Sequence, residues 1–108
     1  MVEHNAQLDL VFGSLSDGTR RDILRRVAVR ELSVGEIAAP YGMSLAAVSK
    51  HLAVLEKARL ITKRREGKLQ MAALCLPALG EAFDHLEGYR QLWEHRLDRL
   101  ERYLENEE

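Results

Sequence analysis

The chain has 108 residues, of which 46% are hydrophobic and 31% charged, with two prolines and one cysteine. This composition predicts one globular domain, residues 1–108, whose core is large enough to fold without disulfide bonds, and it excludes a multidomain enzyme. A single cysteine, Cys75, excludes an intrachain disulfide, and no stretch of about 18 apolar residues is available to span a membrane. We therefore expect a cytoplasmic protein.

The charges are unevenly distributed along the chain. Residues 16–68 contain twelve basic and six acidic side chains, a net charge of +6, whereas residues 69–108 contain four basic and nine acidic side chains, a net charge of −5. A basic central segment beside an acidic C-terminal segment predicts a polyanionic partner for one face of the domain. The alternative is a solvated charge pattern without a partner.

Two amphipathic helices are predicted before residue 30. The first is marked by apolar residues at helical spacing: Leu8, Val11, Phe12 and Leu15. The second follows the capping oxygens of Ser16, Asp17 and Thr19, and its apolar stripe comprises Ile23, Leu24, Val27 and Ala28. The other side of this second helix carries four arginines: Arg20, Arg21, Arg25 and Arg26.

Residues 33–58 show the pattern of a helix-turn-helix. Ser33 with Glu36 three residues later predicts a capping box at the start of a short helix. Pro40 and Gly42 end that helix, because proline lacks a backbone donor and glycine accepts a positive φ. Ser44 caps the next helix, whose core-facing residues are expected to be Leu45, Val48, Leu52 and Leu55. Two short helices joined by a turn that contains glycine form this motif.

The last third of the chain predicts a hairpin and a long helix. Residues 60–74 are expected to form a two-stranded wing around Glu66-Gly67. Residues 77–104 show two apolar series at seven-residue spacing, interrupted only by Arg90: Leu79, Leu86, Trp93 and Leu100, and Phe83, Leu97 and Leu104. Such a helix, about 42 Å long, is too long for a small domain to cover its apolar seam, so we expect it to pair with a second copy. A helix buried within one domain is the alternative.

Three segments carry a resemblance to a known family: Leu-Ser-Asp-Gly-Thr-Arg-Arg at 15–21, Glu-Leu-Ser-Val-Gly-Glu-Ile-Ala at 31–38, and Val-Ser-Lys-His-Leu-Ala-Val-Leu-Glu-Lys-Ala at 48–58. From about residue 8 to the C-terminus, the chain resembles the ArsR family of winged helix-turn-helix repressors. The resemblance implies a mainly α fold with a small β-hairpin, and a homodimeric transcriptional repressor. It places the dimer interface on the first and last helices, where the candidate contacts are Leu8, Val11, Phe12, Leu79, Phe83, Leu86, Trp93, Leu97 and Leu100.

Double-stranded DNA is the predicted partner. An α-helix fits the major groove, and the helix after Ser44 would present Ser44, Ala46, Ala47, Ser49, Lys50 and His51. The wing would bring four cations to an adjacent groove or its phosphates: Lys63, Arg64, Arg65 and Lys68. Ser44 serves as a helix cap in either case, whereas Ser49 and Lys50 have a solvated alternative and His51 a packing one. Arg20 and Arg21 have two alternatives, phosphate contact or an intramolecular ion pair.

Departures from the family pattern concern four positions. Gly18 stands where relatives frequently have proline. Ala46 and Ala47 stand where many ArsR relatives have a polar residue or proline, and alanine offers only apolar contact, for example with a thymine methyl. Arg59 stands where relatives frequently have glycine. A left-handed backbone at Arg59 would carry roughly 1 kcal/mol of strain.

No metal or cofactor is predicted. Ser33 and Gly35 occupy the segment in which one class of ArsR sensors places cysteine thiolates. A second class uses Asp and His ligands on the paired C-terminal helices, and this chain has Asp84, His85, His95 and Asp98 there. His95 and Asp98 share a helical face, but Asp84 and His85 are adjacent and point about 100° apart. A zinc-responsive repressor that uses these ligands remains the alternative.

An enzyme is not predicted. Ser49, Lys50 and His51 are consecutive, so they diverge around a helix and cannot form a nucleophile and its base. The chain also lacks a glycine-rich phosphate loop and a cofactor fingerprint. A protein-interaction module is the rival class, because winged helices also serve as scaffolds. The basic side chains on the wing and the preceding helix favour DNA.

The sequence does not identify the operator or any effector. It also leaves open whether the protein activates or represses transcription and whether Cys75 has a redox role.

Overall fold

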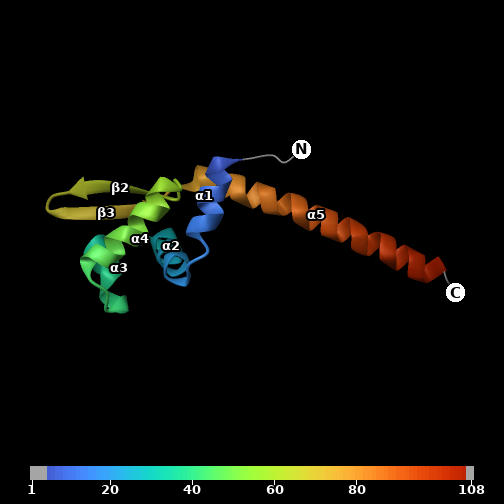
Figure 1. The fold of residues 1–108 in the computed structure, drawn as a ribbon, viewed down its shortest axis with the longest axis horizontal. Coiled ribbons are helices and arrows are strands. Elements are labelled where there is room, and N and C mark those ends of the chain that lie inside the picture. The colour runs from blue at the N-terminus through green and yellow to red at the C-terminus, as the bar shows by residue number, and fades with distance from the viewer. Residues whose placement is uncertain (1–4, 107–108) are drawn as a thin grey trace.

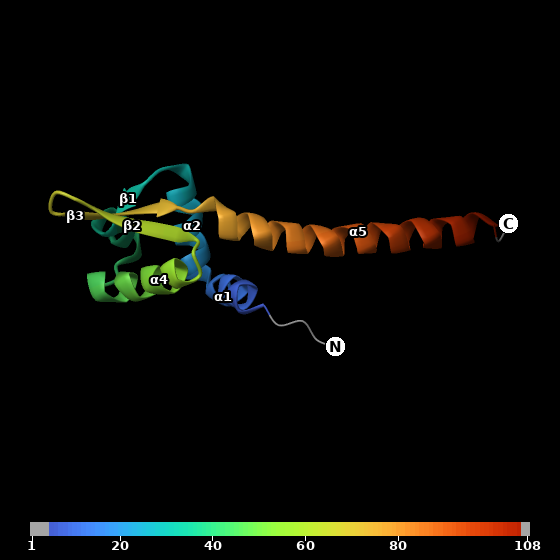
Figure 2. The ribbon, with the colours of Figure 1, turned by 90° about the horizontal axis from the view of Figure 1, so that it is seen from above.

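The computed structural model describes residues 5–106 and shows a winged-helix body from which one long helix projects (Figure 1). The body comprises α1 (Ala6–Ser14), α2 (Gly18–Val29), α3 (Val34–Ala38), the 3-10 turn η1 (Ala39–Tyr41), α4 (Leu45–Lys57), and strands β1 (Leu32–Ser33), β2 (Ile61–Glu66) and β3 (Leu69–Leu74). Helix α5 (Leu76–Asn106) extends from the body in the direction opposite to the hairpin (Figure 2). The molecule therefore measures 70 × 32 × 20 Å.

The helix starts in the body follow the caps that the sequence predicts. The Asp17 carboxylate accepts a hydrogen bond from the Arg20 backbone N–H at 3.0 Å, and the Ser44 hydroxyl accepts one from the Ala47 N–H at 3.1 Å. Ser33 and Glu36 form the reciprocal bonds of the predicted capping box, at 3.1 and 3.0 Å. These side chains satisfy backbone donors that a helix cannot pair internally, and they fix where α2, α3 and α4 begin.

The three strands form one antiparallel sheet in the order β1-β3-β2. In the hairpin, Ile61 pairs with Leu74 and Glu66 with Leu69, which agrees with the predicted wing. Strand β1 adds Leu32 opposite Ala72 on the other edge of β3. The sequence did not predict β1, because two residues are too few to show an alternating pattern.

One hydrophobic core joins the helices to the sheet. Its completely buried members are Val11, Ile23, Ile37, Val48, Leu52, Leu55, Ala58, Leu60 and Ala72.

The burial of two residues differs from the prediction. Val11 is 0% exposed within a single chain, so it is a core residue and not a dimer contact, because apolar spacing alone does not show which side of α1 faces the body. Leu45 is 59% exposed instead of core-facing. It points in nearly the same direction as Leu52, seven residues later, but it is the first residue of α4 and lies where the helix extends past the core.

Arg59, which stands where relatives frequently have glycine, has a left-handed backbone conformation with a φ of 62°. Its backbone N–H donates to the Glu56 carbonyl at 2.9 Å, and the Leu60 N–H donates to the Leu55 carbonyl at 3.0 Å. These bonds end α4 and turn the chain into β2. Because arginine stands where glycine is preferred, this junction carries roughly 1 kcal/mol of backbone strain.

Side chains of α2 hold the turn of the helix-turn-helix. The Tyr41 hydroxyl donates to Asp22 Oδ2 at 2.6 Å, and the Arg26 guanidinium donates to the carbonyls of Glu36 and Ile37 at 2.9 Å each. The guanidinium carbon of Arg26 also lies 5.2 Å from the centre of the Tyr41 ring. The hydrogen bonds from Tyr41 and then from Arg25 hold the pKa of the Asp22 carboxyl below its ordinary value. This cluster joins α2 to both α3 and η1.

We predict that Tyr41→Phe lowers the denaturant midpoint of unfolding at pH 7, since it removes only the hydroxyl that bonds Asp22. A depressed folded-state pKa gives stabilisation that is present above about pH 4 and is lost as pH falls through the folded value. The deficit of the variant relative to the wild type should therefore be smaller at about pH 3 than at pH 7. Thr62→Val, which removes a hydroxyl at an exposed position of β2, serves as the control and should change neither midpoint. An equal deficit at both pH values would contradict the assignment.

Candidate nucleic-acid interface

The inner side of α4 is fixed by the core. Val48, Leu52 and Leu55 are 0% exposed, and α4 contacts α1, α2, α3 and β2. The opposite side of the helix faces solvent, and its exposed residues include Ala46, Ser49, Lys50 and Ala53. The N-terminal end of this solvent-facing side is the part that a recognition helix places against base edges.

The residues predicted to contact DNA on α4 divide into two groups. Ser44, Ala46, Ser49 and Lys50 are exposed, whereas Ala47 and His51 are half-buried. His51 Nδ1 lies 3.9 Å from Asp17 Oδ2 at the start of α2, with 22% of the His51 side chain exposed. A backbone hydrogen bond from Arg20, assisted by the charges of Arg20 and His51, keeps the pKa of Asp17 below its ordinary value. The geometry of His51 thus agrees better with its packing alternative than with a base contact.

The four wing cations also divide into two groups, two that pair with carboxylates in the described part of the chain and two that do not. Lys63 Nζ lies 3.4 Å from Glu56 of α4. Arg64 Nη2 lies 2.5 Å from Glu31 and 3.1 Å from Glu66, so this guanidinium is engaged within the chain.

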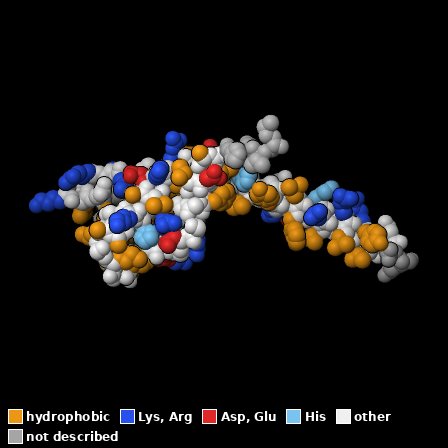
Figure 3. Space-filling model, viewed as in Figure 1, with side chains coloured by type: hydrophobic (Ala, Val, Ile, Leu, Met, Phe, Trp, Pro, Cys, Tyr) orange, Lys and Arg blue, Asp and Glu red, His pale blue; other side chains and the backbone are white. Residues whose placement is uncertain are grey.

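Arg65 and Lys68 are exposed, and neither has an ion pair within residues 5–106. The space-filling view shows basic side chains at the free end of the hairpin (Figure 3). Arg65 and Lys68 are therefore the wing cations free to meet phosphates. The alternation of side chains along β2 places Arg64 and Arg65 on opposite faces, but the carboxylates that pair with Lys63 and Arg64 lie mostly on other elements, which the sequence does not place.

Arg20 and Arg21 bond to backbone carbonyls of their own chain, which is neither of the two predicted alternatives, phosphate contact or an ion pair. Arg20 Nε donates to the Ser14 carbonyl at 2.7 Å, and Arg21 Nη1 donates to the Leu15 carbonyl at 2.8 Å. Both guanidinium groups therefore satisfy carbonyls at the C-terminal end of α1. They fix the corner between α1 and α2 beside the N-terminus of α2.

Comparisons with known proteins agree with this geometry. A family model described as a helix-turn-helix domain matches residues 15–64. The HTH-type transcriptional regulator Rv2034 of Mycobacterium tuberculosis is 41% identical over 92 residues, which cover 78% of this chain and 86% of that protein. The crystal structure of an ArsR family transcriptional regulator matches with a TM-score of 0.78 at 30% identity and covers 87% of this chain and 97% of its own. The chain belongs to the ArsR family of winged helix-turn-helix transcriptional regulators.

Two further relatives add detail. The transcriptional repressor SdpR of Bacillus subtilis is 36% identical over 79 residues, which cover 73% of this chain and 88% of that protein. A homodimeric winged helix-turn-helix DNA-binding domain from Mycobacterium bovis matches with a TM-score of 0.64 at 26% identity, over 84% of this chain and 91% of its own. The ArsR-family assignment makes this chain a DNA-binding regulator and not an enzyme.

Most of α5 is not covered by the winged-helix body of its own chain. Within α5 only Ala78 and Ala82 are buried, and Leu79 packs partly against the core, as does Leu8 of α1. The large side chains farther along are exposed: Phe83, Leu86, Tyr89, Leu92, Trp93, Leu97, Leu100, Tyr103 and Leu104. Phe12 of α1, at 36% exposure, adds to this apolar surface near the body.

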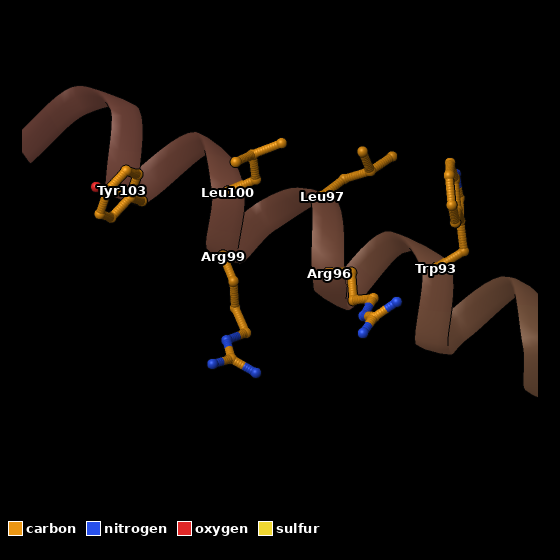
Figure 4. A pocket seen from close by; sticks show the side chains of 6 residues that line it. All are labelled: Trp93, Arg96, Leu97, Arg99, Leu100 and Tyr103. Carbon is orange, nitrogen blue, oxygen red and sulfur yellow. The ribbon is translucent and has the colours of Figure 1, made fainter.

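The exposed apolar side chains of α5 form a stripe. Hydrophobic atoms gather along one side of the projecting helix (Figure 3), and Trp93, Leu97 and Leu100 point to the same side, opposite Arg96 and Arg99 (Figure 4). Arg90, which interrupts the predicted seam, pairs with Glu87 and Glu94 of its own helix at 2.5 Å each. Helix α5, with 31 residues, is about 46 Å long, and the body covers only its first turns. The stripe from Phe83 to Leu104 extends over about 32 Å of that length.

The residues of the alternative zinc site are not gathered within one chain. Across residues 5–106, no group of three or more His, Cys, Asp or Glu side chains is placed to hold a metal ion. His85 instead contacts aromatic rings, with centroids 5.1 Å from Tyr89 and 6.2 Å from Phe12. In the same described part of the chain, no helix has the length and apolar character needed to cross a membrane.

Proposed function

We propose that this ArsR-family regulator is a cytoplasmic repressor that binds an inverted-repeat operator as a homodimer. The observation that carries the proposal is the solvent-facing N-terminal half of α4, with Lys50 exposed, beside a wing whose Arg65 and Lys68 are exposed and not ion-paired within the described residues. A helix and two cations in this arrangement suit a major groove and the neighbouring phosphates. SdpR, a related transcriptional repressor, supports repression as the outcome.

The arrangement assigns different tasks to the two parts of the interface. Lys50 and Ser49 carry the hydrogen-bonding groups on the exposed N-terminal turns of α4, where base edges would lie. Arg65 and Lys68 contribute charge at the wing, where phosphate contact gives affinity without sequence preference. Arg64 supports the wing through Glu31 rather than contacting DNA.

The dimer would form through α5, with Phe12 of α1 at its edge. Burying side chains such as Leu86, Trp93 and Leu97 stabilises a pair by about 1.5 to 3 kcal/mol each. Two-fold pairing would place two α4 helices about 34 Å apart, one turn of DNA, so that each contacts one half of an inverted repeat. The homodimeric relative from Mycobacterium bovis supports this assembly. No metal is part of the proposed mechanism, because Ser33 and Gly35 supply no thiolates.

The first test is the salt dependence of binding to duplex DNA. Each phosphate contact removed should flatten the slope of log K against log salt by about 0.9 per subunit. We expect Arg65→Ala with Lys68→Ala to flatten the slope, and Lys50→Ala to weaken binding. Arg99→Ala, which removes an exposed arginine of α5, is the matched control and should leave the slope unchanged. Slopes and affinities equal to the wild type in all variants would contradict the DNA interface.

The second test concerns the dimer. Leu97→Glu would place two like charges near the two-fold axis in a partly desolvated seam, at a cost of several kcal/mol per dimer. Sedimentation at micromolar concentration should then show a monomer, with specific DNA binding lost and weak non-specific binding retained. Gln91→Glu adds the same charge to an exposed position of α5 outside the seam and should remain dimeric. A Leu97→Glu variant that stays dimeric would refute the proposed interface.

A further inference from the structure

The solvent-facing side of α4 is poor in groups that can hydrogen-bond to bases. Its sequence, Leu-Ala-Ala-Val-Ser-Lys-His-Leu-Ala-Val-Leu-Glu-Lys, contains no Arg, Asn or Gln. Of the residues that make bidentate contacts to guanine or adenine it has only lysine, at Lys50 and at Lys57 in the last turn. In the first two turns only Ser49 and Lys50 combine exposure with a side-chain donor. Hydrogen bonds from α4 therefore specify few base pairs in each half-site.

Apolar side chains occupy the end of α4 that would lie deepest in the groove. Leu45, the first residue of the helix, is 59% exposed, and Ala46 beside it is exposed as well. Because each Cα–Cβ bond in a helix tilts toward the N-terminus, the Leu45 side chain lies over the leading end of α4. Val48, one turn later, fills the core position, so packing within the chain does not account for Leu45.

The major groove offers one apolar group to such a surface, the 5-methyl group of thymine. A methyl group against Leu45 and Ala46 buries apolar area and leaves no polar atom unpaired. A cytosine amino group or a guanine carbonyl at the same place would lose water without gaining a hydrogen bond. The chemistry of this end of the helix thus selects T·A pairs over G·C pairs.

We infer that Leu45, together with Ala46, is a specificity-determining residue that contacts a thymine methyl group in each operator half-site. The inference rests on the proposed DNA-binding function and deepens it, because it names the base feature that α4 recognises. It assigns sequence preference to an apolar contact, with Lys50 supplying affinity and at most one further base contact.

The experiment begins with selection of duplexes from a random pool by the full chain. Each thymine of the selected half-site is then replaced by uracil, which removes only the methyl group. At one or two thymines we expect the wild type to lose about fourfold in affinity for one half-site and about fifteenfold when both half-sites are replaced, as expected for the burial of one methyl group.

Two variants connect the effect to Leu45. Leu45→Ser should lose most of the preference for thymine over uracil at the sensitive position, and its thermal unfolding should match that of the wild type because Leu45 is exposed. Val29→Ser, which alters an apolar residue of α2 with 82% exposure, is the matched control and should keep the full thymine preference. An undiminished preference for thymine in Leu45→Ser overturns the assignment.

The possible outcomes distinguish failure of the thymine contact from failure of the proposed DNA-binding function. A selected consensus without thymine in its half-sites, or equal binding of thymine and uracil operators by the wild type at every position, overturns the methyl contact and leaves the DNA-binding function intact. Failure to bind or enrich any duplex would overturn the proposed function itself.

Discussion

Val48, Leu52 and Leu55 lie completely buried on one side of α4, in the core that α4 shares with α1, α2, α3 and β2. Their burial fixes the rotation of α4 about its own axis, so that Ser49 and Lys50 face solvent. The same core holds Ala58, Leu60 and Ile61, and the wing therefore leaves the body at a set position beside α4. Because a core substitution such as Leu52→Ala costs about 2 to 5 kcal/mol, this packing is the constraint on which the whole candidate interface depends.

In contrast to α4, the long helix α5 has most of its apolar side chains outside the core. The body has too little surface to cover 31 helical residues, so apolar side chains from Phe83 to Leu104 remain in solvent in a single chain. Exposed apolar patches of this extent mark interaction surfaces, and the acidic side chains of α5, from Glu81 to Glu105, are separated in space from the basic wing and α4 (Figure 1). The division of charge thus matches a division of tasks, with one end of the molecule suited to DNA and the other to a second subunit.

The sequence predicted the elements that local chemistry decides. The capping box at Ser33, the turn at Gly42 and the hairpin all depend on a few neighbouring residues. The failures depend on contacts between elements. Leu45 followed the apolar spacing of α4 but lies beyond the core, and Val11 belongs to the core although it shares its spacing with Phe12. Apolar periodicity indicates which residues of a helix share a face. Only the packed fold shows whether that face contacts the core of the same chain or remains available to a partner.

The measurement that most directly tests the central claim is hydroxyl-radical footprinting of the wild-type chain on an operator selected from random duplexes. Two α4 helices presented by one dimer should protect two segments on the same face of the duplex, with centres about 10 base pairs apart and related by the symmetry of the inverted repeat. A single protected segment, or uniform protection without this spacing, would contradict a dimer that contacts two successive major grooves.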